Sequence, residues 1–221
     1  VKDFYNTFYT PGNAVLVLSG AFTEANTRAM IEEFFGDIPC NPAPIVRPVF
    51  EEEEQTAERR ETVSDESVPL PGVFYTYRMP PEGSDEAIAL DLLTDILSTG
   101  RSSRLYQRLV YKDKLASEIS AYVDLREMPG LVWFYAIANL PEQDLAPIEA
   151  AIEEVIADIR TTNVSEIELQ KAKNKTEMRL IAGRVTASGK ADQLAHARIF
   201  FNDTSKANSV IDRYLAVTTE D

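Results

Sequence analysis

The sequence predicts an α+β fold, a mixed sheet rich in antiparallel strands with helices packed on it. Side chains at 73–79 alternate between two sets, as they do along a strand. Residues 119–125 alternate too, and Pro129-Gly130 turns the chain back into an apolar run at 131–138, so these segments form a hairpin. Apolar residues between 145 and 159 recur about every 3.6 residues, the period of a helix. The hairpin makes the sheet at least partly antiparallel.

The first 38 residues predict the end of a helix, then a strand, then a second helix. Aromatic residues at 4, 5, 8 and 9 are spaced for one helical face. Residues 14–18 are a short continuous apolar run, typical of a strand buried on both faces. Thr23 is placed to cap the following helix and Gly36 to end it.

Residues 39–60 change character and predict an extended linker. Prolines at 39, 42, 44 and 48 oppose helix, and the four adjacent glutamates at 51–54 repel one another. Adjacent side chains diverge and offer no second ligand type, so the glutamate run favours a solvated segment over a metal site.

A second unit begins at residue 61. After its first strand, Ser84 caps a helix with apolar positions between 89 and 97, Gly100 stops it, and another helix starts at about Ser102. Beyond the hairpin and the 145–159 helix, Ser165 and Glu168 form a capping box. Two further helices are expected, containing residues 194–200 and 210–215.

Composition and charge narrow the classes of partner. The 221 residues carry a formal net charge of −14, which repels phosphate backbones and anionic lipid headgroups, so neither nucleic acid nor a membrane surface is expected as a partner. No run of about eighteen apolar residues is present, so no membrane span is expected. The acidic surface favours a solubilising role, and an attraction for basic peptides is the alternative.

The side chains that hydrolytic chemistry needs are scarce. Cys40 is the only cysteine and His196 the only histidine, which excludes an intramolecular disulfide and a multi-cysteine metal site. His196 lies in an apolar helical segment and is expected to be structural or partly exposed. We therefore predict no catalytic, cofactor-binding or metal-binding residue in this chain.

Three other groups have ordinary explanations that we prefer. Residues 100–104 could cradle an anion, but a turn followed by a helix cap explains them. Ser102 or Ser103 as a nucleophile would need a base, and only His196 is available. Asp91 and Asp95 share a helix face, and ordinary surface is the expected environment.

Five segments in order resemble one family. They are 8–17 closed by Gly20 (like "YxPxNxxLxxxG"), 34–39 ("FGxIP"), 100–106 ("SRLY" after a small-residue turn), 115–121 (a strand entry) and 166–174 ("EExxxAKN"). The chain is thereby identified as a member of the pitrilysin/insulinase-type (inverzincin) zinc metallopeptidases, which include the mitochondrial processing peptidases. It is similar to their inactive, C-terminal-type domain region and to bacterial processing-peptidase-like zinc proteases. The resemblance implies the fold of one such domain.

The resemblance also implies a division of the chain. Residues 1–38 match the last strand-helix part of a preceding metal-bearing domain and could pack onto the following domain. Residues 39–60 are the linker, and 61–221 match the second, non-catalytic domain without its closing helix and strand. We hypothesise that the strand at 14–18 fills the vacant position in the second domain's sheet, or otherwise pairs with another molecule.

The family's two functional features are missing here. The H-x-x-E-H helix that binds zinc is absent, so the resemblance places the zinc ligands upstream of Val1. The arginine and tyrosine that hold substrate in the partner domain match Val110 and Ser117, which cannot replace them. Zinc is therefore implied for a full-length parent, and the expected partners are the missing zinc-bearing domain and a homologous subunit that supplies the Arg/Tyr pair.

Two functions follow as hypotheses. In the first, the chain is the non-catalytic portion of a zinc-dependent metalloendopeptidase and forms chamber wall and a surface for peptide or unfolded polypeptide. In the second, it is an assembly or scaffold subunit from an inactive homologue. Only the resemblance bears on compartment, since bacterial relatives are often periplasmic.

Overall fold

The computed structural model describes residues 1–41, 44–47, 53 and 55–221. The chain divides into two compact units, one of residues 1–64 and 184–204 and one of residues 65–183 and 205–221. The division expected from the sequence places residues 184–204 in the second domain, whereas here they group with the N-terminal residues. The division into 1–38, 39–60 and 61–221 itself stays a prediction, and most of the glutamate run at 51–54 lies outside the described residues.

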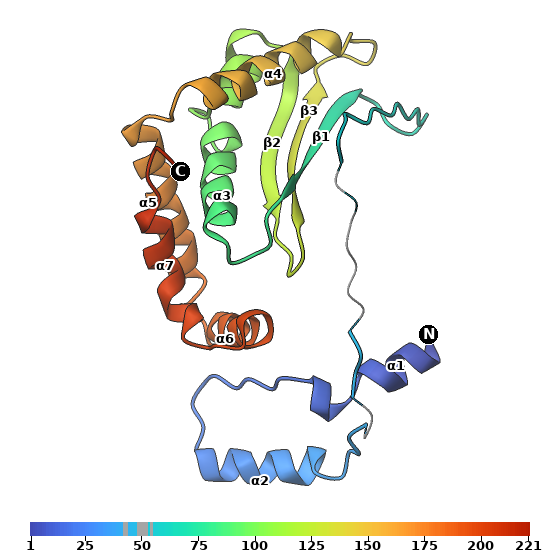
Figure 1. The fold of residues 1–221 in the computed structure, drawn as a ribbon, viewed down its shortest axis with the longest axis vertical. Helices are drawn as coiled ribbons and strands as arrows, with labels where there is room; N and C mark the ends of the chain where they lie inside the picture. Colours follow the sequence, from blue (N-terminus) through green and yellow to red (C-terminus); the bar gives the residue numbers. More distant parts are fainter. Residues whose placement is uncertain (42–43, 48–52, 54) are drawn as a thin grey trace. The chain divides into compact units, whose positions relative to one another are not determined.

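The larger unit contains an antiparallel sheet of three strands, as the sequence predicts (Figure 1). The strands are β1 (Gly72–Met79), β2 (Ala116–Asp124) and β3 (Gly130–Ala138), in the order β1-β3-β2. β3 is the central strand and pairs antiparallel with both neighbours. Its alternation of buried and half-buried residues reflects the two different environments of the sheet's faces.

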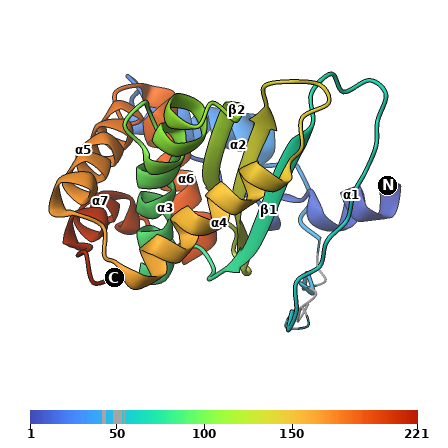
Figure 2. The same ribbon diagram turned by 90° about the horizontal axis from the view of Figure 1, so that it is seen from above.

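Helices cover one face of this sheet and enclose the main core. They are α3 (Asp85–Ser98), the π-helix η2 (Tyr106–Lys112) and α4 (Ala146–Thr161). Leu105, Leu109 and Ile148 are fully buried among them, and each such side chain stabilises the fold by about 1.5–3 kcal/mol. Figure 2 shows the strands and these helices from above.

The helix expected from about Ser102 is present and differs from an ordinary α-helix in its type. It begins at residue 104, and from residue 106 its turns are wider than those of an α-helix. The Asp113 N–H accordingly donates to the Arg108 carbonyl oxygen, five residues back, at 3.0 Å. Lys114 follows with a left-handed backbone (φ 54°), which redirects the chain into β2.

A second core lies on the other side of α3. Two helices, α5 (Glu166–Ala182) and α7 (Lys206–Ala216), pack there against Ile88, Leu92 and Ile96. The predicted capping box at the start of α5 is confirmed, with Ser165 and Glu168 each bonding the other's backbone. Ser84 caps α3 as predicted, because its side chain accepts from the Ala87 N–H at 3.1 Å.

The smaller unit consists of helices and irregular segments. Its elements are α1 (Lys2–Phe8), the 3-10 helix η1 (Pro11–Asn13), α2 (Glu24–Phe35) and α6 (Ala187–Phe201). Neither α1 nor α2 has a buried residue. Ile38, Leu16 and Leu18 are also exposed, so the apolar side chains that predict a core here are not enclosed by the described residues.

The strand predicted at 14–18 is wrong. Ala14 has extended backbone angles (φ −117°, ψ 147°), but residues 14–18 belong to no strand, and the sheet of the described chain consists of β1, β2 and β3. The hypothesis that this segment completes the second domain's sheet is therefore also wrong. An apolar run favours extended backbone, but a strand exists only where a neighbour pairs its N–H and carbonyl groups.

No helix in the described part of the chain combines the length and apolar character needed to cross a membrane.

Candidate functional site

The face of the sheet turned away from α3, η2 and α4 is the candidate functional site, and we call it the open face. Because side chains alternate along a strand, every second residue of each strand lies on this face. The strand register arranges these residues in four rows across β1, β3 and β2: Gly72, Ile137 and Glu118; Phe74, Tyr135 and Ser120; Thr76, Trp133 and Tyr122; Arg78, Leu131 and Asp124.

Two aromatic pairs occupy the middle rows. Phe74 stacks on Tyr135 with ring centroids 5.7 Å apart, and Tyr122 stacks on Trp133 at 6.2 Å with the ring planes only 8° apart. Phe74 is 63% exposed and Tyr122 45% exposed, while Trp133 and Tyr135 are half-buried. Large exposed aromatic side chains gathered on one surface typically mark a binding site.

Gly72 leaves room for the first aromatic pair. A Cβ at this position would lie 2.9 Å from Ile137 Cδ1 and 3.3 Å from Phe74 Cε2. A side chain here would therefore crowd the end of Ile137 first and press on the edge of the Phe74 ring.

Polar groups frame the aromatic rows. The Tyr135 hydroxyl donates to Glu118 Oε1 at 2.7 Å, and this bond raises the pKa of Tyr135. Asp124 accepts from Arg126 at 2.6 and 2.9 Å, and this contact raises the pKa of Arg126. The open face is thus an apolar and aromatic platform with charged ends, suited to holding an extended chain by stacking and apolar contact.

The positions that match the family's Arg/Tyr pair lie beside the sheet, on its helical side and at its entry. Val110, in η2, is half-buried and packs against the main core. Ser117, at the irregularity between Ala116 and Glu118, donates to the carbonyl oxygens of Ile137 and Ala138 at 3.2 and 3.1 Å. Each side chain therefore has a local structural contact, and a short serine cannot reach as far as a tyrosine.

The remaining candidates from the sequence each lie in surroundings of their own. His196, in α6, is exposed and stacks on Phe200 with centroids 4.5 Å apart. Cys40 is exposed and free. Ser103 is buried and donates to the Gly100 carbonyl oxygen at 2.7 Å, closing the predicted turn.

The same turn is tied to α5. Ser102 accepts from Lys171, and Arg104 donates to both carboxylate oxygens of Glu168, from Nε at 2.7 Å and from Nη2 at 2.9 Å. Two of the segments that carry the family resemblance are thus joined by polar contacts, and residues 100–104 have a structural explanation.

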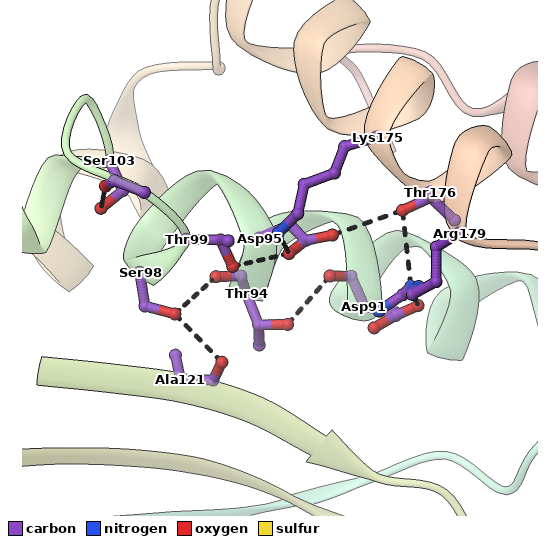
Figure 3. A network of polar contacts seen from close by, with 11 residues as sticks. Asp91, Thr94, Asp95, Ser98, Thr99, Ser103, Ala121, Lys175, Thr176 and Arg179 are labelled. Atoms are coloured by element: carbon purple, nitrogen blue, oxygen red, sulfur yellow. Dashed lines mark hydrogen bonds and ion pairs between the residues drawn. The ribbon is translucent and has the colours of Figure 1, made fainter. Parts of the chain in front are cut away.

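The expectation for Asp91 and Asp95 is wrong. Their side chains are only 13% and 10% exposed; they join α3 to α5 (Figure 3), and Asp91 also joins it to α7. Asp95 accepts from Thr99, Lys175 and Thr176, and Asp91 from Arg179 and Tyr214. The periodicity of α3 predicts one apolar face, whereas the structure buries this helix against the sheet on one side and against α5 and α7 on the other.

The residues present do not fit a zinc ion. Zinc sites are built from histidine, cysteine and carboxylate groups that converge on one point. Across residues 1–41, 44–47, 53 and 55–221, no three such side chains are grouped to hold a metal, and His196 stacks on an aromatic ring instead.

The open face itself was missed by sequence reasoning. The alternation at 73–79 identifies the strand, but it does not reveal which side the helices cover. Aromatic residues on both faces of β1 and β3 were the available signal, since an interior face and a solvent face rarely both carry them.

Comparisons with known proteins agree with this architecture. Residues 1–176 match the family described as the Peptidase M16 inactive domain. The zinc protease PqqE of Helicobacter pylori is 23% identical over 196 residues, which cover 88% of this chain and 44% of that protein. An uncharacterised zinc protease of Mycobacterium bovis is 24% identical over 221 residues, covering 100% of this chain and 50% of its own length.

Among solved structures, a protease from Helicobacter pylori has the same fold. It superposes with a TM-score of 0.90 at 23% identity, covering 99% of this chain and 53% of that one. The chain therefore spans about half the length of the relatives it matches.

Proposed function

Since this chain belongs to the Peptidase M16 inactive domain family of zinc proteases, we propose that it is the non-catalytic portion of a zinc-dependent metalloendopeptidase. In this proposal its open face forms part of the chamber wall and holds peptide or unfolded polypeptide, while the hydrolytic zinc is bound elsewhere in the parent protein. The two stacked aromatic pairs of the open face, each with one exposed ring, are the observation that carries the proposal.

The geometry of the open face suits an extended polypeptide. A peptide in extended conformation presents side chains to one side at every second residue, the same period as the strands beneath it. Exposed aromatic rings gain about 25 cal/mol for each Å² of apolar surface that a ligand covers. Such contacts are independent of exact sequence, which is what a wall for unfolded polypeptide requires.

The chemistry itself must come from outside this chain. Zinc and its ligands are proposed to lie in the missing zinc-bearing domain, and a homologous subunit is proposed to supply the Arg/Tyr pair that Val110 and Ser117 do not replace. We expect the 221-residue chain alone to hydrolyse no peptide and, after dialysis, to retain far less than one zinc per chain. Stoichiometric zinc with peptide turnover by this chain would contradict that expectation.

One observation also favours an assembly or scaffold role in an inactive homologue. Val110 contributes to the core and Ser117 to backbone contacts, so both positions have structural contacts in place of the family's substrate-holding arginine and tyrosine. The sequence of the parent upstream of Val1 separates the two functions: an H-x-x-E-H motif there supports the peptidase, and its absence supports the scaffold.

Trp133 gives a direct test of peptide binding. It is the only tryptophan and lies in the second aromatic row, so its fluorescence reports on the open face. We expect a saturable change in Trp133 emission on titration with an uncharged synthetic peptide of alternating leucine and serine. Phe74→Ser is expected to weaken binding about fivefold or more, since anchor aromatic residues dominate such contacts.

Tyr111→Ser is the matched control. Tyr111 is 71% exposed but belongs to η2, on the other side of the sheet. Its replacement should leave the titration unchanged. If no peptide alters Trp133 emission, or if both variants weaken binding equally, the open face is not the peptide-binding surface.

A further inference from the structure

Each end of the open face carries an exposed charged side chain, and the two side chains have opposite sign. The aromatic rows are bounded on one side by the row that contains Arg78 and on the other by the row that contains Glu118. Arg78 lies on the β1 edge and Glu118 on the β2 edge, so the charges are at diagonal corners of the platform.

Arg78 is available to an incoming anion. Its side chain is exposed and makes no ion pair within the described part of the chain. Asp124, the carboxylate of the same row, is already paired with Arg126 at 2.6 Å. At this end of the open face, Arg78 is therefore a cationic side chain without an ionic partner among the residues that the structure describes.

Glu118 is the counterpart at the other end. It is exposed, and its Oε1 accepts the Tyr135 hydroxyl at 2.7 Å. That bond orients the carboxylate over the face and leaves its charge without a cationic partner among residues that the structure describes. A basic group on a ligand would pair with it beside the first aromatic row.

The spacing of the rows matches an extended peptide. Gly72 and Arg78 begin and end the four rows along β1, a separation of about 20 Å at about 3.3 Å per residue. A peptide that lies over β3 places alternate side chains over successive rows. Arg78 and Glu118 each lie one strand away from β3, about 4.8 Å to the side. Lysine and glutamate side chains of the peptide are long enough to reach them.

We infer that the open face selects extended peptide segments in which a basic and an acidic side chain, separated by five residues, flank apolar side chains. Over the four rows, the basic group meets Glu118, two apolar side chains meet the aromatic pairs, and the acidic group meets Arg78. A peptide can satisfy this pattern in either chain direction. The inference rests on the proposed function, because it specifies which polypeptides the wall prefers.

A double-mutant cycle between protein and peptide tests the inference. The probe is the end-capped peptide Lys-Ser-Leu-Ser-Leu-Ser-Glu, and its partner ends in Gln instead of Glu; binding to the 221-residue chain is followed by Trp133 emission. Arg78→Gln is expected to weaken binding of the Glu peptide about twofold to fivefold, as for an exposed ion pair. It should leave binding of the Gln peptide unchanged.

Glu118→Gln is likewise expected to weaken binding of the Lys peptide about twofold to fivefold. It should leave binding of a peptide with Gln in place of Lys unchanged. Arg160→Gln, an exposed arginine in α4, is the control for net charge and should affect all peptides equally. A peptide with the two charges at positions i and i+3, with two residues between them, places them on opposite sides and should lose the coupling to one corner.

The outcomes separate the inference from the function beneath it. If the peptides change Trp133 emission but their charges do not couple to Arg78 and Glu118, the charge pattern is wrong while the binding wall stands. If none of the peptides changes the emission, the proposed function itself fails.

Discussion

The Tyr214 hydroxyl of α7 donates a hydrogen bond to Asp91 Oδ2 of α3 at 2.6 Å. Burial, followed by the charge and the hydrogen bond of Asp91, raises the pKa of Tyr214 well above its ordinary value. The phenol therefore stays protonated and serves as a donor. Arg213 adds a bond from the same helix to the Gly83 carbonyl oxygen at 2.7 Å, so α7 is held to the start and the middle of α3.

Replacing Tyr214 with phenylalanine should loosen this attachment. The ring would keep its apolar contacts, but Asp91 would lose a donor, and a hydrogen bond to a charged group contributes about 1.5–3 kcal/mol. We expect the free energy of unfolding in urea to fall by about 2 kcal/mol, followed by Trp133 emission. Tyr122→Phe, which alters a hydroxyl on the exposed sheet face, should change it by less than about 0.5 kcal/mol. Equal effects of the two variants would show that the Tyr214 bond adds nothing.

Asp95 should make stability depend on pH. Its burial raises the pKa, but hydrogen bonds from Thr99 and Lys175 and the charges of Lys175 and Arg179 outweigh burial and lower it below 3.8. A carboxyl with a lowered folded-state pKa stabilises the fold above its unfolded pKa, and that stabilisation is lost as the pH falls through the folded value. We expect Asp95→Asn to lower stability by about 1–3 kcal/mol at pH 7, with a smaller difference from wild type near pH 3. A difference that stays constant from pH 7 to pH 3 would contradict this role.

The sheet and the helices that follow it could be predicted because their patterns are local. Alternation identified β1 and β2, Pro129-Gly130 identified the hairpin, and the Ser165–Glu168 capping box marked the start of α5. Each of these signals depends on residues a few positions apart in the sequence. They can therefore be recognised without knowledge of the tertiary contacts.

Apart from the wide turns of η2, which are a local feature, the errors concern contacts between distant residues. The run at 14–18 has the composition of a strand, but composition does not supply a pairing neighbour. Asp91 and Asp95 have the spacing of a solvent face, and only the packing of α5 and α7 brings Lys175, Arg179 and Tyr214 to them. The open face was hidden for the same reason, since its exposure depends on which side the helices pack.

Arg104 and Glu168 should be energetically coupled. Hydrogen bonds from Arg104, opposed by burial and supported by Ser165, lower the pKa of Glu168 from 4.5 to about 2. Both side chains are partly shielded, at 20% and 32% exposed, so the pair should contribute about 1 kcal/mol at pH 7. A cycle of Arg104→Gln, Glu168→Gln and the double variant should show this coupling, and it should disappear as the pH falls from 4.5 towards 2.

The Asp124–Arg126 pair is the control for that cycle. Arg126 is 64% exposed, so Asp124→Asn and Arg126→Gln should couple by less than about 0.5 kcal/mol. If the two cycles give the same coupling, shielding does not strengthen the Arg104–Glu168 pair.

Gly130 should be the least tolerant glycine of the sheet. It is buried at the start of β3, and a Cβ there would lie 2.1 Å from the Asp124 carbonyl oxygen on the opposite strand of the hairpin. The backbone would have to move, because no flexible side chain can yield, and overpacking of this kind costs about 1–3 kcal/mol. We expect Gly130→Ala to lower the urea midpoint of Trp133 emission accordingly. Gly100→Asn is the matched control: Gly100 has a left-handed backbone (φ 82°) with no atom within 4 Å of an added Cβ, and asparagine tolerates that conformation. A Gly130→Ala chain as stable as the Gly100→Asn chain would show that the hairpin accommodates a methyl group without cost.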